Sequence, residues 1–376
     1  MEMNSMVENA KFCFWNRRVK STDVSVLMES GPHWFSNNKQ GVHLNRDSRQ
    51  ASDKAEHTGV AARHHFPLLI HEAQSGPLDR STDLIFYRFG KAALALIFLF
   101  FIITATGMAQ ENLRVMSFNI RLATPDDGVD YWPNRKEMVA SMVRFHEADL
   151  VGLQEAMRIQ LDDLEKLLPE YGWYGLCRTD GSVYPEPDNE FSAILYRRSR
   201  FELLDSATFW LSESPETVGS KGWDAALPRI ASWLKLKDKV SGKEFYHVNT
   251  HFDHRGEQAR AESARLLLKK IKEIAGESPV LLTGDFNCVP TDEPYRILTD
   301  KGSGLADALF LSEQPHHGPL STWSGFQFPG MPGRRIDYIF VNDKIRVQKH
   351  AILSESWSGR FPSDHLPVLA EVGVGR

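Results

Sequence analysis

Asp285 and Asn287 are the two residues whose types and spacing most directly suggest chemistry in this sequence. They follow an apolar run at 279–282 that is bounded by a proline and a glycine and is typical of a buried strand. Side chains two residues apart on an extended backbone project from the same face. The sequence therefore predicts a carboxylate and a carboxamide at the end of a core strand. Such a pair can position a water and hold an oxygen of a phosphate or a metal.

Further polar side chains stand at the boundaries of other predicted strands. Each alone has an ordinary explanation, such as a turn, a helix cap or a packed histidine. Together they combine histidines with carboxylates, the usual pairing of a general acid or base. Oxygen ligands without clustered Cys or His favour Mg²⁺ or Mn²⁺ over zinc, which suits metal-assisted hydrolysis of a phosphate ester. These residues are Asn119, Glu155, His251, Asp337, Asp364 and His365.

Strand and helix signals alternate from residue 113 onward and must position these side chains. Helices are expected at 134–146, 159–168, 257–275 and 292–298. Strands are expected at 113–119, 149–155, 191–196, 201–211, 231–236, 245–251, 279–282, 336–341, 345–353 and 366–372. Many strands with few helices between them predict two sheets packed face to face with the helices outside.

Composition excludes several classes of protein. The chain has 376 residues, of which 42% are apolar, so it can build a large core. Its net charge of −5 argues against strong binding of duplex DNA through bulk electrostatics. The three cysteines, Cys13, Cys177 and Cys288, have no zinc-finger spacing and do not suggest a disulfide scaffold.

The N-terminal part of the chain contains a segment that resembles a signal peptide. Residues 1–85 are polar and are interpreted as a disordered extension, or as a stretch that is not made because the start codon was placed too early. Residues 86–109 combine a basic stretch, an apolar run and the small residues Gly107 and Ala109. We therefore expect export of a domain at 110–376, to the periplasm or the medium. The alternative is a membrane anchor at 92–109, whose apolar run is borderline in length.

Seven short motifs, taken in order, resemble those of the endonuclease/exonuclease/phosphatase superfamily, the group that includes deoxyribonuclease I. They lie at 116–120, 152–155, 189–196, 249–251, 284–287, 335–340 and 363–367. Each is weak alone, but the ordered set is specific and runs from about residue 113 to 372. With the export signal, the resemblance is to a secreted bacterial member. It implies an α/β fold, a four-layer α/β/β/α sandwich of two packed mixed β-sheets flanked by helices.

The resemblance also implies a metal site and a base. Glu155 would be the principal ligand of Mg²⁺, or of Mn²⁺, with Asn119 and Asp364 close to the metal. His365, oriented by Asp337, would act as the general base on the attacking water.

Other residues would contact the phosphate and the water. By resemblance, Asp285 would position or deprotonate the water, Asn287 would hold a non-bridging phosphate oxygen, and His251, supported by Glu190, would contact the phosphate. Arg335 belongs to a pair of arginines whose guanidiniums suit a phosphate group, although a solvated loop explains it equally well.

Metal-dependent hydrolysis of a phosphate ester is the predicted function. One alternative is a deadenylase-like 3′–5′ exonuclease or an extracellular endonuclease, and a less favoured one is an inactive binding module on the same fold. Arg121 stands two residues after Asn119, where AP endonucleases carry an acidic residue, which argues against abasic-site repair. The substrate stays open among nucleic acid, phospholipid headgroup, sugar phosphate and inositol phosphate. No obligate protein partner is implied.

Overall fold

The computed structural model describes residues 112–375, apart from 186–188 and 328–333. The predicted extension at 1–85 and the predicted signal at 86–109 lie outside the described residues. Within the described part, no helix is both long enough and apolar enough to cross a membrane.

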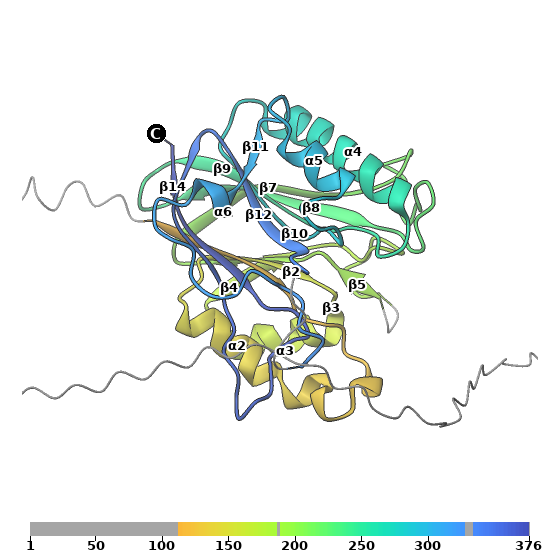
Figure 1. Cartoon of the computed structure of the whole chain (residues 1–376), viewed down its shortest axis with the longest axis vertical. Helices are drawn as coiled ribbons and strands as arrows, with labels where there is room; N and C mark the ends of the chain where they lie inside the picture. Colours follow the sequence, from red (N-terminus) through yellow and green to blue (C-terminus); the bar gives the residue numbers. More distant parts are fainter. Residues whose placement is uncertain (1–111, 186–188, 328–333, 376) are drawn as a thin grey trace, which may run out of the picture. The chain divides into compact units, whose positions relative to one another are not determined.

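Two six-stranded sheets form the centre of the domain (Figure 1). In spatial order, the first contains β13 (Ile345–Ile352), β14 (Val368–Val374), β1 (Leu113–Asn119), β2 (Leu150–Gln154), β6 (Ile194–Arg197) and β4 (Tyr171–Tyr174). The second contains β11 (Leu305–Asp307), β12 (Asp337–Asn342), β10 (Val280–Asp285), β9 (Glu244–His251), β8 (Ile230–Asp238) and β7 (Phe201–Trp210). In each sheet one central pair is parallel, β1 with β2 and β9 with β10, and the other pairs are antiparallel.

Helices cover the outer face of each sheet. Figure 1 shows α2 (Lys136–Phe145) and α3 (Arg158–Leu167) beside the first sheet, and α4 (Glu257–Ala275) and α5 (Glu293–Thr299) beside the second. Shorter elements are two 3₁₀ turns at Pro125–Asp130 and Trp132–Asn134, a two-stranded ribbon of β3 (Ala156–Met157) and β5 (Glu190–Phe191), and α6 (Ala308–Leu311). The predicted sandwich of two mixed sheets flanked by helices is confirmed.

Side-chain alternation along the strands divides the core into three layers. In β1, Leu113 and Val115 pack between the sheets, whereas Met116 and Phe118 pack against α2 and α3. In the second sheet, Leu281 packs between the sheets while neighbouring residues pack against α4. Because each strand has apolar residues on both faces, its sequence reads as an almost continuous apolar run.

The strand faces between the two sheets change from apolar to polar along their length. In β1 the order is Leu113, Val115, Ser117 and Asn119, which lie on the same face by alternation. The matching series are Leu281, Thr283, Asp285 in β10; Phe245, His247, Asn249, His251 in β9; and Val341, Ile339, Asp337 in antiparallel β12. The polar ends of these faces meet at one edge of the sandwich.

A buried polar seam between the sheets precedes this edge. Asn249 Nδ2 donates to the carbonyls of Leu153, at 2.8 Å, and Ala193, at 3.0 Å, both from the opposite half. Its Oδ1 accepts from Gln154 Nε2 at 2.7 Å and Thr283 Oγ1 at 3.0 Å. All four side-chain capacities of this amide are therefore used inside the protein.

Most predicted elements are present within a residue or two of their expected ends, and α4 has the predicted bounds. The short elements that were not predicted are β3, β4, β11, α6 and the two 3₁₀ turns. Each has two to six residues, which is too short for an apolar period to stand out.

A substitution at Gly152 tests how closely the two sheets approach each other at the seam. A Cβ at this position would lie 2.1 Å from Thr283 Oγ1 and 2.5 Å from Asn249 Oδ1. We expect Gly152→Ala to lower the free energy of unfolding, measured by urea denaturation, by about 2 kcal/mol or more, because an overpacked seam must break hydrogen bonds. Gly302→Ala is the control, since its Cβ would meet nothing closer than 3.5 Å. Equal losses in both variants would contradict this account.

Candidate active site

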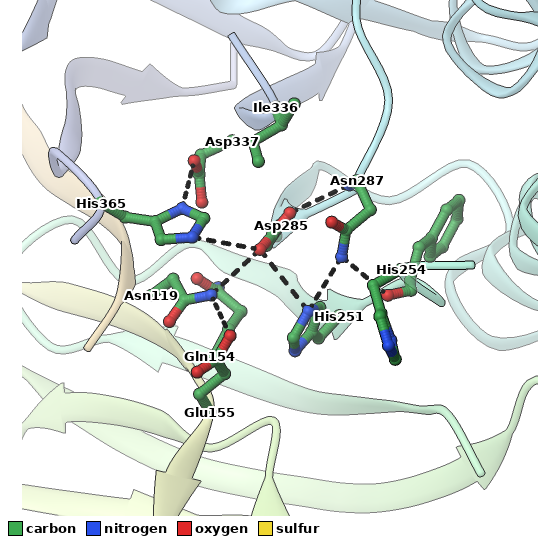
Figure 2. Close-up of polar contacts among 12 residues, drawn as sticks. Asn119, Gln154, Glu155, His251, His254, Asp285, Asn287, Ile336, Asp337 and His365 are labelled. Carbon is green, nitrogen blue, oxygen red and sulfur yellow. Dashed lines mark hydrogen bonds and ion pairs between the residues drawn. The ribbon is translucent and has the colours of Figure 1, made fainter. Parts of the chain in front are cut away.

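Asp285 lies at the centre of a polar cluster where the two parallel strand pairs end (Figure 2). Its Oδ2 accepts from Asn119 Nδ2 at 3.0 Å and lies 3.5 Å from His251 Nε2 and 3.8 Å from His365 Nε2. Its Oδ1 accepts from the backbone N–H of Asn287 at 2.9 Å. Residues from both sheets thus converge on one carboxylate.

Asn119 joins Asp285 to the second acidic group of the cluster. Its Nδ2 also donates to Glu155 Oε1 at 3.1 Å, so one amide holds two carboxylates. Glu155 Oε2 accepts from the backbone N–H of Leu122 at 3.1 Å and lies 3.8 Å from Arg121 Nη1. Glu155 has a φ of 57°, a left-handed conformation that non-glycine residues rarely adopt. Such strain is concentrated at functional positions.

His365 is held by Asp337, as predicted. The Nδ1 of His365 lies 2.9 Å from Asp337 Oδ2, and both side chains are buried. Burial alone would lower the pKa of His365, but the neighbouring carboxylates of Asp337, Asp364 and Asp285 outweigh it and raise the pKa well above its usual value. The neighbouring carboxylates therefore favour the protonated form of His365 in the metal-free protein.

His251 has the opposite electrostatic setting. Its Nε2 faces Asn287 Nδ2 at 3.0 Å, whereas its Nδ1 lies 4.0 Å from Glu190, too far for a direct hydrogen bond. Glu190 instead forms a two-point ion pair with Arg178, at 2.7 and 2.8 Å. Burial, and then the charges of Arg229 and Arg178, lower the pKa of His251 well below its usual value. The lowered pKa favours the neutral ring of His251, and the predicted support from Glu190 is not a direct contact.

The cluster carries a surplus of buried negative charge. Burial and the nearby Asp337 raise the pKa of Asp285 to about 7. Burial also raises the pKa of Asp364, and the charge of Glu155 acts in the same direction. For Glu155 itself, the raising effect of burial is outweighed by His365, Asn119 and Arg121, so its pKa is lowered.

This donor set fits a hard divalent cation. Glu155, His251 and Asp285 each offer a ligand atom within 4.8 Å of the others, and so do Asp285, Asp337 and His365. Among the predicted ligands, Glu155 and Asp364 supply carboxylates, whereas Asn119 uses its amino group to bridge Glu155 and Asp285. Carboxylate oxygens that raise one another's pKa are stabilised by a bound Mg²⁺ or Mn²⁺.

Two predictions about individual residues need correction. Strand β10 ends at Asp285, so Asn287 does not share a strand face with it; Asn287 reaches the cluster through a left-handed backbone, with a φ of 48°. Arg335 was a candidate phosphate ligand, but its guanidinium is buried, 2.7 Å from Asp307 Oδ2 and stacked on Tyr338. The structure favours a stabilising role for Arg335, because its guanidinium charge is already paired with Asp307 inside the protein.

Two arginines beside the cluster were not predicted from the sequence. Buried Arg135 donates to the backbone carbonyls of Ile120, Arg121 and Pro362, so it ties the loop after β1 to the loop before Asp364. Arg178 pairs with Glu190, as described above. Neither belongs to a short motif, and only the folded chain brings them to the site.

His254 also lies near the cluster and was not among the candidate residues. Its Nδ1 lies 3.0 Å from Arg229 Nη2, and Arg229 in turn pairs with Asp253 at 3.3 Å. The local motif of Asp and His two and three residues after His251 was the available signal.

Comparisons with known proteins identify the family of the chain. Residues 116–365 match the Endonuclease/Exonuclease/phosphatase family. A solved endonuclease/exonuclease/phosphatase from Bacteroides vulgatus is 41% identical, with a TM-score of 0.67, and the match covers 70% of this chain and 99% of that one. The mannosyl-6-phosphatase of Bacteroides thetaiotaomicron is 38% identical, with a TM-score of 0.64, over 69% of this chain and 99% of that one.

More distant curated relatives are longer proteins. Nocturnin of Drosophila melanogaster is 22% identical over 69% of this chain and 46% of its own length, and human Nocturnin is 25% identical over 69% and 64%. The chain thus spans about half to two thirds of these relatives. On the family match and the bacterial structures, the chain belongs to the endonuclease/exonuclease/phosphatase family, whose members are metal-dependent phosphoester hydrolases.

The raised pKa of Asp285 predicts how this residue affects stability. Because its pKa is about 7 in the folded protein and 3.8 ordinarily, the folded state binds the proton more tightly, and stability is lost as pH rises through 7. In EDTA, Asp285→Asn should therefore raise the thermal midpoint relative to wild type more at about pH 8 than at about pH 5. Asp343→Asn, on an exposed side chain, is the control. A gain that is larger at the lower pH would refute the assignment.

Metal binding can be measured without activity. We expect Glu155→Gln to weaken binding of Mg²⁺ or Mn²⁺, followed by calorimetry, by at least about tenfold, because it replaces a carboxylate ligand by a neutral amide. Glu165→Gln, on the exposed side of α3, is the matched control. Equal metal affinities for the two variants would remove Glu155 from the metal site.

Proposed function

We propose that the protein is a Mg²⁺-dependent phosphomonoesterase that acts on a sugar phosphate. The observation that carries the proposal is the arrangement around Asp285. Glu155, His251, Asn287 and His365 surround this carboxylate, as Figure 2 shows, and Asp364 lies near enough for the charges of Glu155 and His365 to act on its pKa. This arrangement can hold a cation and a phosphate dianion side by side.

The charge or pKa of each side chain in the cluster indicates its role in the proposed reaction. A bound Mg²⁺, held by Glu155 with Asp364 close by, would neutralise charge on the phosphate oxygens. The raised pKa of His365 favours its protonated form, which can donate to a phosphate oxygen. Asp285, with a pKa of about 7, can take a proton from water near neutral pH, where such transfer is most effective.

These pKa shifts change the predicted division of labour. His365 was expected to be the general base, but its raised pKa favours the protonated form, which cannot accept a proton. We therefore assign the base to Asp285 and phosphate binding to His365. Asn287 stays a predicted phosphate contact: its Nδ2 donates to His251 Nε2 and to the carbonyl of Phe252, so contact with a phosphate would replace one of these two hydrogen bonds.

A small substrate is favoured over a polynucleotide. Several arginines near the cluster are already paired with carboxylates: Arg121 with Asp127, Arg178 with Glu190, and Arg229 with Asp253. Paired guanidiniums contribute little to an extended track for a nucleic-acid backbone. The similarity to a mannosyl-6-phosphatase over almost all of that protein points to a hexose phosphate.

Substrate preference is tested directly on the purified protein with Mg²⁺. We expect release of inorganic phosphate from mannose 6-phosphate with a kcat/KM at least about tenfold above that for bis-p-nitrophenyl phosphate, because the site is matched to a terminal phosphate. Glu155→Gln should be inactive and Glu165→Gln fully active. Faster cleavage of the diester, or of RNA or single-stranded DNA, would favour the nuclease alternative instead.

A further inference from the structure

A small cavity borders His251, one of the residues that contact Asp285. Its volume is about 10 Å³, which accommodates the centre of one water molecule. Its lining residues include Arg178, Glu190, Ser192, Arg229 and His251. Two buried nitrogens of these residues have no hydrogen-bond partner in the described protein, His251 Nδ1 and Arg229 Nη1.

The proton of His251 is on the nitrogen that faces away from Asn287. Asn287 Nδ2 donates to the carbonyl of Phe252 at 3.1 Å, and a carbonyl can only accept, which fixes this atom as the amino nitrogen. The same amino group lies 3.0 Å from His251 Nε2, which must therefore accept. A ring whose Nε2 accepts carries its proton on Nδ1, and this N–H is one of the two buried donors.

The other donor is Arg229 Nη1, as the contacts of the three guanidinium nitrogens show. Its Nε faces Asp253 at 3.3 Å, and its Nη2 faces His254 at 3.0 Å. Only Nη1 remains, and it is buried beside the cavity. A buried donor without an acceptor is costly, so both N–H groups require an acceptor in the cavity.

Glu190 supplies the remaining partner. Its Oε2 lies 4.0 Å from His251 Nδ1, which is too long for a direct hydrogen bond and suits a bridge through one water. Arg178 Nη1 donates a hydrogen bond to this oxygen at 2.8 Å, and the second lone pair of the oxygen remains available. A water has two lone pairs for the two donors and a proton for Glu190.

We propose that one buried water in this cavity accepts from His251 Nδ1 and Arg229 Nη1 and donates to Glu190 Oε2. Arg229 is then a positioning residue for His251: through the water it fixes the ring so that Nε2 faces Asn287 and the cluster around Asp285. The structural part of this inference stands alone, whereas its kinetic part rests on the proposed phosphatase activity.

A crystal structure of the purified protein at a resolution that reveals ordered waters tests the structural part without any assay. We expect one water within hydrogen-bonding distance of all three atoms. A dry cavity, or a Glu190 carboxylate bonded directly to His251 Nδ1, would overturn the proposal.

Variants of Arg229 test the kinetic part with p-nitrophenyl phosphate as the substrate. Arg229→Met should lower kcat about tenfold or more with little change in KM, as loss of an orienting partner does. Arg229→Lys should not restore kcat, because one ammonium cannot face Asp253, His254 and the cavity together. Rescue by lysine would show that charge alone matters and would overturn the positioning role.

Arg200→Met controls for the loss of a buried ion pair. Arg200 pairs with Asp149 at 3.0 Å and with Asp238 at 3.4 Å, and Asp149 precedes β2 at the end opposite the site. We expect lower stability with unchanged kcat in this variant. An equal loss of kcat in Arg200→Met and Arg229→Met would reduce the effect to general destabilisation and refute the role of Arg229.

Discussion

The side-chain amide of Asn249 fixes how the two sheets face each other, and the candidate site depends on that register. It donates to two carbonyls associated with the first sheet and accepts from Gln154 and Thr283, all in fully buried positions. A shift of one sheet past the other would leave several buried polar groups unpaired, each at a cost of about 1–3 kcal/mol. Apolar packing alone tolerates small slips, whereas these directional bonds do not. The seam therefore holds Asn119 and Glu155 opposite Asp285 and His251.

Beyond the seam, the site concentrates features that destabilise a fold. Glu155 and Asn287 have left-handed backbones, and Asp285 is a buried carboxyl group whose pKa is raised to about 7. Such arrangements persist only where the surrounding structure determines them strongly. Here the seam, the Thr322 hydroxyl that accepts from the backbone N–H of Asp337, and the clamp of Arg135 provide that support. The acidic surplus is the condition for holding a divalent cation next to a phosphate.

Much of the fold could be predicted from the sequence because the central strands are apolar on both faces and bounded by turn residues. The site residues could be named for a similar reason: Asn119, His251, Asp285 and Asp337 end or begin such strands. The features that could not be predicted depend on how the chain is arranged in three dimensions. The positive φ of Asn287, the ion pair of Arg335 with Asp307 and the contact of His254 with Arg229 arise from packing between segments far apart or from loop geometry. Short-range periodicity carries no information about these contacts.

The two histidines show why motif and role are separate questions. Each was expected to be backed by a carboxylate, and each has one nearby. Asp337 contacts His365 directly and, with the other carboxylates, raises its pKa, whereas Glu190 is already bound by Arg178 and stays 4.0 Å from His251. Burial, and then the charges of Arg229 and Arg178, lower the pKa of His251. A similar pairing in the sequence thus accompanies opposite pKa shifts in the two histidines, which both flank Asp285, the group to which we assign the base.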